Sequence, residues 1–448
     1  MKLQLIKIRD TLSDSFWFLP ALMALLATGA ALGSVAIDHA IGSDWVHDMG
    51  WVWSGGADGA RSVLSVVAGS IMTVVSIVFS LTVTTLAQTS SHFGPRVLRN
   101  FTSDRGVQFT LGTYIATFVY SLLVLRTVRT EYSVEESTFV PYLSVNIGML
   151  LALTSLAVLI YFIHHVSQSI QAENLIADVG SEFQKLLPVL FPEEIGQPQS
   201  DDASPLQLPD ESQWQTAHIV TASDNGYLQG VDDDLLMSLA AKHDLILKLV
   251  KRPGDFITSD EPLLRVLPPS RMTDDIETDL RACFSQGSRR TPHQDALYVV
   301  QQLVEIAAHA LSPGINEPFT ALTCIDWLGA SLRGVAKREL PVPLRQDEDG
   351  RLRVIASALD FEELAHAAFD PIRLYGASNP DVMQRLLGIM IEIAPDLHRD
   401  LDRIALMRHA RLIGEDAVQI TNETDRRRVA DCLQKTLRAL TKSPAKEE

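Results

Sequence analysis

The stretch Ser62–Pro95 reads SVLSVVAGSIMTVVSIVFSLTVTTLAQTSSHFGP and contains no Asp, Glu, Lys or Arg. A helix needs roughly 20 mainly apolar residues to cross a lipid bilayer. Three further charge-free stretches reach that length, namely Ser15–Ile37, Gly106–Leu125 and Ser137–Ile170. Because a helix inside a soluble protein rarely runs so long without a charge, the sequence predicts four transmembrane helices within residues 1–170.

Charge divides the chain into two parts. The 448 residues include 38 Lys+Arg and 55 Asp+Glu, for a net charge of -17. Residues 1–170 hold 9 basic and 10 acidic residues, which leaves 29 and 45 for the rest, so the second part carries -16. Nucleic-acid binding requires a basic face. The composition therefore excludes a single soluble domain and argues against nucleic acid as a partner.

Lys and Arg indicate the orientation, because they are retained on the cytoplasmic side of short flanking segments. Basic residues precede the first span and fill the segment between the second and third: Lys2, Lys7, Arg9, Arg96, Arg99 and Arg105. The segment after the first span is acidic, with Asp38, Asp44, Asp48 and Asp58 against Arg61. We expect both termini in the cytoplasm.

An alternative is a cleaved secretory signal that ends at Ser34-Val35-Ala36. The apolar stretch is longer than a normal signal core, which favours an uncleaved first helix.

No acidic or basic residue lies inside a span, which disfavours proton relays, ion-coupled transporters and voltage sensors. Asn146 is the most polar side chain within the fourth span, and we expect it to clasp a neighbouring helix.

Small and hydroxyl residues form one stripe along the second span, because they recur every third or fourth position. They are Ser65, Gly69, Thr73, Ser76, Ser80, Thr84 and Gln88. Such a stripe commonly allows close helix packing in lipid, here against Gly112, Ala116 and Tyr120 of the third span. Alternatively, hydroxyls around a symmetry axis would line a water-filled pore, with Arg96 and Arg99 at its inner mouth.

The second part is predicted to be a cytoplasmic α+β domain that is mostly helical. A helical extension covers residues 171–191, an acidic Pro-rich linker 192–213, a small β-rich module 214–269 and a mainly helical region 270–448. Within the module, strands over 218–222 and 227–231 flank Asn225-Gly226, which predicts a tight hairpin. In the helical region we expect one strand, over 351–356.

Nothing in the chain indicates catalysis. There is no Walker loop, no zinc-protease or nucleophile-elbow motif and no dinucleotide fingerprint. Cys283, Cys324 and Cys432 lack Cys-x-x-Cys spacing and are expected to be reduced thiols. Biotinyl and lipoyl carrier domains attach their cofactor to a lysine at a hairpin tip, and no lysine stands at such a position here. We therefore predict no enzymatic activity, no cofactor and no metal site.

Several blocks of residues resemble one family, the bacterial predicted membrane proteins known as domain of unknown function 2254. The blocks are Phe79-Ser80-Leu81, Phe93-Gly94-Pro95-Arg96 with Phe101, Phe118-Val119-Tyr120-Ser121-Leu122, Arg290-Thr291 with Gln294-Asp295, and Ala310-Leu311-Ser312-Pro313-Gly314-Ile315-Asn316 before Pro318. Glu317 replaces the Asp expected in relatives and keeps the carboxylate. The resemblance implies a bacterial inner-membrane protein and brings no established activity.

The polar residues in the blocks around Arg290 and Asn316 have two possible roles. Asn316 or Glu317 precedes Pro318, so either would cap the next helix. Alternatively, six residues would converge on a pocket in which arginines bind a small anionic ligand: Arg289, Arg290, His293, Asp295, Asn316 and Glu317.

The best functional hypothesis from the sequence is a homo-oligomeric, gated pathway for ions or small solutes in the bilayer. The second span would line it, and the cytoplasmic domain would regulate it. The rival hypothesis is a non-conducting sensor or scaffold whose membrane part anchors a ligand-binding domain. Oligomer symmetry distinguishes the two, because only a ring with the second span around its axis creates a shared path.

Overall fold

The computed structural model describes residues 15–42, 55–97, 101, 104–129, 139–169, 171–191, 208–340, 343–357 and 359–441. The chain divides between Gln171 and Ala172 into a membrane unit and a soluble unit. Several expectations concern residues outside the described ranges, namely those on Lys2, Lys7, Arg9, Asp44, Asp48, Arg99 and the linker residues 192–207.

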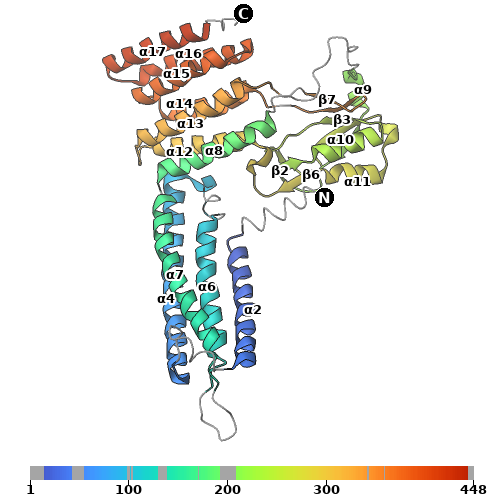
Figure 1. Cartoon of the computed structure of the whole chain (residues 1–448). Helices are drawn as coiled ribbons and strands as arrows, with labels where there is room; N and C mark the ends of the chain where they lie inside the picture. The colour runs from blue at the N-terminus through green and yellow to red at the C-terminus, as the bar shows by residue number, and fades with distance from the viewer. Residues whose placement is uncertain are drawn as a thin grey trace, which may run out of the picture. The chain divides into compact units, whose positions relative to one another are not determined.

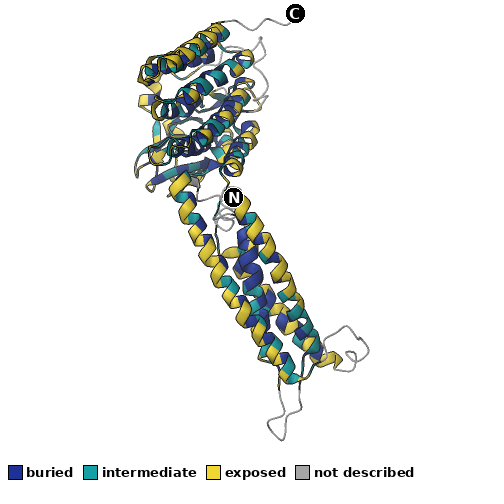
Figure 2. Cartoon of the chain, turned by 90° about the vertical axis from the view of Figure 1, so that its left-hand side faces the viewer, coloured by how far each residue is buried: buried dark blue, intermediate teal, exposed yellow. Residues whose placement is uncertain are grey.

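The membrane unit contains four helices that are long and apolar enough to cross a bilayer, which confirms the predicted spans. They are α2 (Phe18–Ile41), α4 (Ala57–Phe93), α6 (Arg105–Leu125) and α7 (Tyr142–Ser169). The other three helices all pack on α6. In its most apolar stretch 61% of residues are buried, against 22% in α2, so α6 is the centre of the bundle (Figures 1 and 2).

A buried polar network joins α2 to the start of α7. The Asp38 carboxylate, 4% exposed, accepts hydrogen bonds from the backbone N–H groups of Leu143 and Ser144, both at 2.9 Å, and from Ser144 Oγ at 2.6 Å. Ser34 Oγ lies 2.9 Å from the Tyr120 hydroxyl. Asp38 therefore caps α7 from another helix, since the first N–H groups of a helix have no partner within it. This network makes α2 part of the bundle.

The soluble unit contains two β-sheets whose strands pair antiparallel, except for the parallel pair β3–β8. The order of the larger sheet is β1-β5-β3-β8-β7, and that of the smaller is β4-β2-β6. The strands are β1 (His218–Thr221), β2 (Gly226–Val231), β3 (Ile246–Leu249), β4 (Phe256–Ile257), β5 (Pro262–Leu267), β6 (Phe284–Gly287), β7 (Leu344–Gln346) and β8 (Leu352–Ile355). Three of the eight come from beyond residue 269, so the sheets are not confined to residues 214–269.

The hairpin predicted around Asn225-Gly226 is wrong, although both of its strands form. β1 pairs with β5, whereas β2 pairs with β4 and β6. Asn225 Oδ1 accepts a hydrogen bond from Ser259 N at 2.7 Å, so the side chain joins two loops. A Cβ atom on Gly226 would lie 2.8 Å from Gly287 O. The glycine permits a close strand approach and does not form a two-residue turn.

The remaining helices stack in two layers beyond α8 (Ala172–Leu190). One layer is α12 (Ala296–Ala310), α14 (Phe361–Tyr375) and α16 (Asp400–Asp416); the other is α13 (Pro318–Ala336), α15 (Pro380–Ile393) and α17 (Glu423–Thr441). Each helix packs on the next in its own layer and on its partner across the layers, and α8 packs on α12 and α13. The order resembles that of helical repeat proteins, in which neighbouring pairs bury one another's apolar faces.

Two glycines in this stack are expected to respond oppositely to the same change. A Cβ on Gly180 of α8 would lie 2.2 Å from the Trp327 ring, whereas a Cβ on Gly388 of α15 meets nothing closer than 3.6 Å. Gly180→Ala should destabilise the full-length protein by about 1–3 kcal/mol through overpacking. Gly388→Ala should stabilise it by up to about 1 kcal/mol through helix propensity. Chemical unfolding in detergent measures both, and equal shifts would contradict the packing of α8 on α13.

Candidate functional site

The stripe on α4 is exposed along its whole length. Ser65, Gly69, Thr73, Ser76, Ser80, Thr84 and Gln88 all lie on the surface of the single chain. The opposite face of α4 is the buried one, and it includes Leu64, Ile71 and Val78. On α6, Gly112 packs against Met23 and Pro20 of α2 and not against α4. The stripe therefore does not form the seam between the second and third spans that would have explained it within one chain.

Hydroxyl groups of the stripe are bonded within their own helix. Thr73 donates to Gly69 O at 3.2 Å, Ser76 to Met72 O at 3.0 Å and Thr84 to Ser80 O at 2.9 Å. Asn146 Nδ2 likewise donates to Tyr142 O of its own helix, at 2.9 Å. A Cβ on Gly69 would meet no atom within 4 Å. This face can therefore approach a further helix closely while the hydroxyls of Thr73, Ser76 and Thr84 stay bonded.

A partly exposed Arg290 and a buried Asp295 form an ion pair at the start of α12. Arg290 Nε and Nη2 donate to the two Asp295 oxygens at 2.7 and 2.8 Å, and Nη1 donates to Gln301 at 2.7 Å. The Arg290 guanidinium also lies over the Tyr298 ring. Asp295 additionally caps α12 by accepting from Tyr298 N at 3.0 Å. The neighbouring Arg289 and His293 side chains are exposed.

Asn316 and Glu317 lie beyond the other end of α12. The 15 residues of that helix separate them from Arg290 and Asp295 by about 22 Å along its axis. Both side chains are exposed. The structure thus brings together only part of the six-residue set, and the Arg290 guanidinium is already occupied by Asp295. The six side chains do not share one anion pocket.

The prediction that the side chain of Asn316 or Glu317 caps α13 is wrong. Glu317 is the N-cap of α13, and its side chain makes no capping hydrogen bond. Asn316 has a φ of 52°, a left-handed conformation, and its N–H donates to Ser312 O at 2.9 Å. Asparagine and glycine tolerate this conformation better than other residues. The residue is therefore explained by its backbone angle and not by a side-chain cap.

Substitutions of Asn316 should follow its backbone angle. Asn316→Gly should leave the free energy of unfolding within about 0.5 kcal/mol, and Asn316→Ser should not be better than Asn316→Ala, each costing about 1 kcal/mol. A side-chain cap predicts the reverse, with Ser preserving stability and Ala losing it. Unfolding curves of the full-length variants distinguish the two orders.

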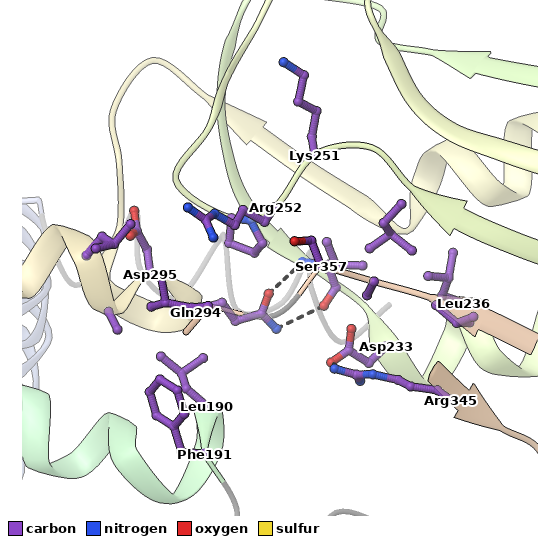
Figure 3. A pocket seen from close by; sticks show the side chains of 18 of the residues that line it. Leu190, Phe191, Asp233, Leu236, Lys251, Arg252, Gln294, Asp295, Arg345 and Ser357 are labelled. Atoms are coloured by element: carbon purple, nitrogen blue, oxygen red, sulfur yellow. Dashed lines mark hydrogen bonds and ion pairs between the residues drawn. The ribbon is translucent and has the colours of Figure 1, made fainter. Parts of the chain in front are cut away.

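The soluble unit contains a cavity of about 200 Å³ that the sequence did not indicate (Figure 3). Its walls come from elements far apart in the chain, so no local motif marks it. Most lining side chains are apolar, including Leu190 and Phe191 at the end of α8 and Leu236 of α10 (Asp233–Lys242). Figure 3 shows Asp233 and Arg345 side by side at one end, and Gln294 and Asp295 along another wall.

The charged groups around this cavity are paired. Arg252 donates to both Glu363 oxygens at 2.6 and 2.7 Å, and this pair raises the pKa of Arg252 and lowers that of Glu363. Arg345 Nη1 lies 3.5 Å from Asp233 Oδ2. Burial raises the pKa of Asp233, and Arg345 opposes that shift. The cavity therefore suits a small, largely apolar molecule better than a free anion.

Among the described residues, no group of three His, Cys, Asp or Glu side chains could hold a metal ion. Cys283 and Cys324 are buried free thiols, and burial raises the pKa of Cys283 to about 12. A thiol with so high a pKa is protonated at neutral pH and is a poor nucleophile.

These features define a class of multi-pass membrane protein in which four apolar helices precede a mixed helix-and-sheet soluble unit. The chain belongs to the family described as predicted membrane protein (DUF2254), which matches residues 13–392 and confirms the resemblance noted in the sequence. It is 32% identical over 426 residues to uncharacterized proteins of Mycobacterium tuberculosis and Mycobacterium bovis, which covers 94% of this chain and 79% of each relative. No solved structure matches the chain.

Proposed function

We propose that the protein is a homo-oligomeric, gated pathway for ions or small solutes, with α4 of each copy lining the path. The observation that carries the proposal is the exposure of all seven stripe residues, Ser65, Gly69, Thr73, Ser76, Ser80, Thr84 and Gln88, on a face that no other described helix covers. A row of hydroxyl groups makes no favourable interaction with the acyl chains of the bilayer. A ring of α4 helices would place that row around water.

Charge at the end of α4 would set the selectivity of this path. Arg96 follows the helix in a short 3₁₀ turn and is exposed, and Arg99 lies three residues further on. If both termini are cytoplasmic, Arg96 flanks the inner mouth, and Arg99 is outside the described residues. Fixed positive charge there would concentrate anions by an amount that falls with ionic strength. We therefore expect a modest preference for anions over cations.

The soluble unit would control the path through its cavity. α8 follows α7 in the chain after Gln171, and Leu190 and Phe191 at its far end line the cavity. A small, mainly apolar ligand there would contact both α8 and the sheet elements. Binding energy that differs between two positions of α8 would bias the pathway toward one state. The alternative is a non-conducting sensor, which the same cavity supports without any role for α4.

Conductance of Ser80→Leu tests the pathway directly. A leucine at position 80 would narrow and dry the path, so ion current through purified oligomers in planar bilayers should fall at least about tenfold. The matched control is Phe79→Leu, since Phe79 is 45% exposed on α4 but lies about 100° around the helix from Ser80. It should conduct normally.

Oligomer size and yield are measured on the same preparations. If the stripe only packs helices of neighbouring copies together, Ser80→Leu should break the oligomer or reduce the folded yield. Intact Ser80→Leu oligomers with unchanged current would contradict the pathway. Wild-type oligomers that pass no ions would also contradict it, whereas monomeric wild-type protein would favour the anchored sensor.

A further inference from the structure

The membrane unit has a groove of about 600 Å³ on its surface, formed by α2, α6 and α7. Leu19, Phe109, Ala157 and Val158 line most of it, and Arg105 and Tyr161 lie at one end. Apart from Thr154, whose hydroxyl donates to Leu150 O of its own helix at 2.9 Å, its lining is thus apolar along the groove and polar at the start of α6. This distribution matches a phospholipid, whose acyl chain is apolar and whose headgroup carries a phosphate.

At the polar end, side chains around the first turn of α6 are joined by hydrogen bonds and a ring contact. Asp104 Oδ1 accepts from Gly106 N at 2.7 Å, and the other carboxylate oxygen lies 2.7 Å from His165 Nε2. The His165 ring stacks on Tyr161 with their centroids 5.4 Å apart. A Cβ on Gly106 would lie 2.9 Å from the Tyr161 hydroxyl, so the glycine admits that hydroxyl to the helix start.

Arg105 differs from its neighbours because its charge is not used within the unit. Asp104 is engaged by His165 and by the N–H groups that it caps. The Arg105 side chain is exposed and makes no ion pair with any described residue. An unpaired guanidinium at the mouth of an apolar groove is complementary to a phosphate. Tyrosine hydroxyls also favour the headgroup level of a bilayer.

We propose that this groove binds one anionic phospholipid, with an acyl chain along Phe109 and Val158 and the phosphate against Arg105 and the Tyr161 hydroxyl. The bilayer is the medium that meets these helices, so the occupant is a bilayer lipid and not a soluble anion. Arginine can bind a phosphate through two parallel N–H groups, which adds geometric selectivity. The proposal is independent of whether α4 lines a pathway.

The headgroup end is tested by lipid retention in native mass spectrometry. Full-length protein is purified in mild detergent and titrated with phosphatidylglycerol or phosphatidylcholine. Wild type should retain phosphatidylglycerol preferentially, and Arg105→Gln should lower that preference about fivefold, the effect of one cation near an anionic surface. Arg126→Gln is the matched control, because Arg126 is exposed at the other end of α6. It should leave the preference unchanged.

The acyl-chain end is tested by filling the groove. Ala157→Phe should reduce retention of both lipids, whereas Leu156→Phe should not, because Leu156 is 57% exposed but lies outside the groove. If Arg105→Gln does not fold, Arg105→Lys replaces it in the test. This variant keeps the charge but loses the two parallel N–H groups, so it should lower the preference for phosphatidylglycerol only in part. Equal retention of the two lipids by wild type, or equal losses in Arg105→Gln and Arg126→Gln, would overturn the proposal.

Discussion

Arg290→Met is expected to lower the free energy of unfolding by about 3–5 kcal/mol, the cost of leaving a buried charge without its partner. Asp295 is 4% exposed, and Arg290 donates two hydrogen bonds to its carboxylate. Without the guanidinium, that buried carboxylate loses both of these hydrogen bonds and the charge paired with it. Urea unfolding of the full-length protein, followed by circular dichroism, measures the change.

Arg289→Met is the matched control for this experiment. Arg289 is adjacent in sequence, but its side chain is exposed, so its loss should change stability by less than about 0.5 kcal/mol. Arg290→Lys should fall between the two, because an ammonium cannot reproduce the two parallel hydrogen bonds. Equal stabilities of the Arg289 and Arg290 variants would show that the ion pair does not support α12.

Asp38→Ala is expected to destabilise the membrane unit by about 3 kcal/mol. The substitution removes three hydrogen bonds and leaves the N–H groups of Leu143 and Ser144 at the start of α7 without the carboxylate that caps them. Hydrogen bonds to charged groups contribute about 1.5–3 kcal/mol each, and part of that is recovered if water reaches the helix end. Thermal unfolding in detergent should show the loss.

Asp58→Ala provides the control for Asp38. Asp58 is also acidic and lies in the first turn of α4, where it is exposed. Its removal costs at most the small interaction with the helix dipole, about 0.3–1 kcal/mol. Asp38→Asn should be intermediate, since one acceptor oxygen remains. A melting temperature for Asp38→Ala equal to that of Asp58→Ala would contradict the capping of α7 by α2.

Periodicity in the sequence predicted the stripe on α4 but not the direction in which it faces. The same spacing of small residues suits a buried seam and an exposed face equally well. The direction depends on which helices neighbour α4, and α6 and α7 cover the face of Leu64 and Ile71 instead. For the same reason, Gly112 was paired with the wrong helix: it contacts Met23 of α2.

Local signals also failed where one residue type serves two purposes. Asn225-Gly226 has the composition of a hairpin turn, yet Gly226 meets Gly287 and the flanking strands join different sheets. Asparagine is a common helix-capping residue, yet at position 316 the φ of 52° accounts for the choice of asparagine. A turn or cap preference is worth about 1 kcal/mol, so contacts from distant segments decide between such uses.

The sequence by itself determined the number and positions of the four spans, the acidic second half and most of its helices. Those features follow from runs and periods within a single segment, where the absence of charge or the spacing of apolar residues is sufficient. Only the tertiary structure decided the exposure of the α4 stripe, the Asp38 cap on α7, the Arg290–Asp295 pair and the cavity beside Phe191. Each of these depends on which faces meet, and that is set by packing and hydrogen bonding among all the elements together.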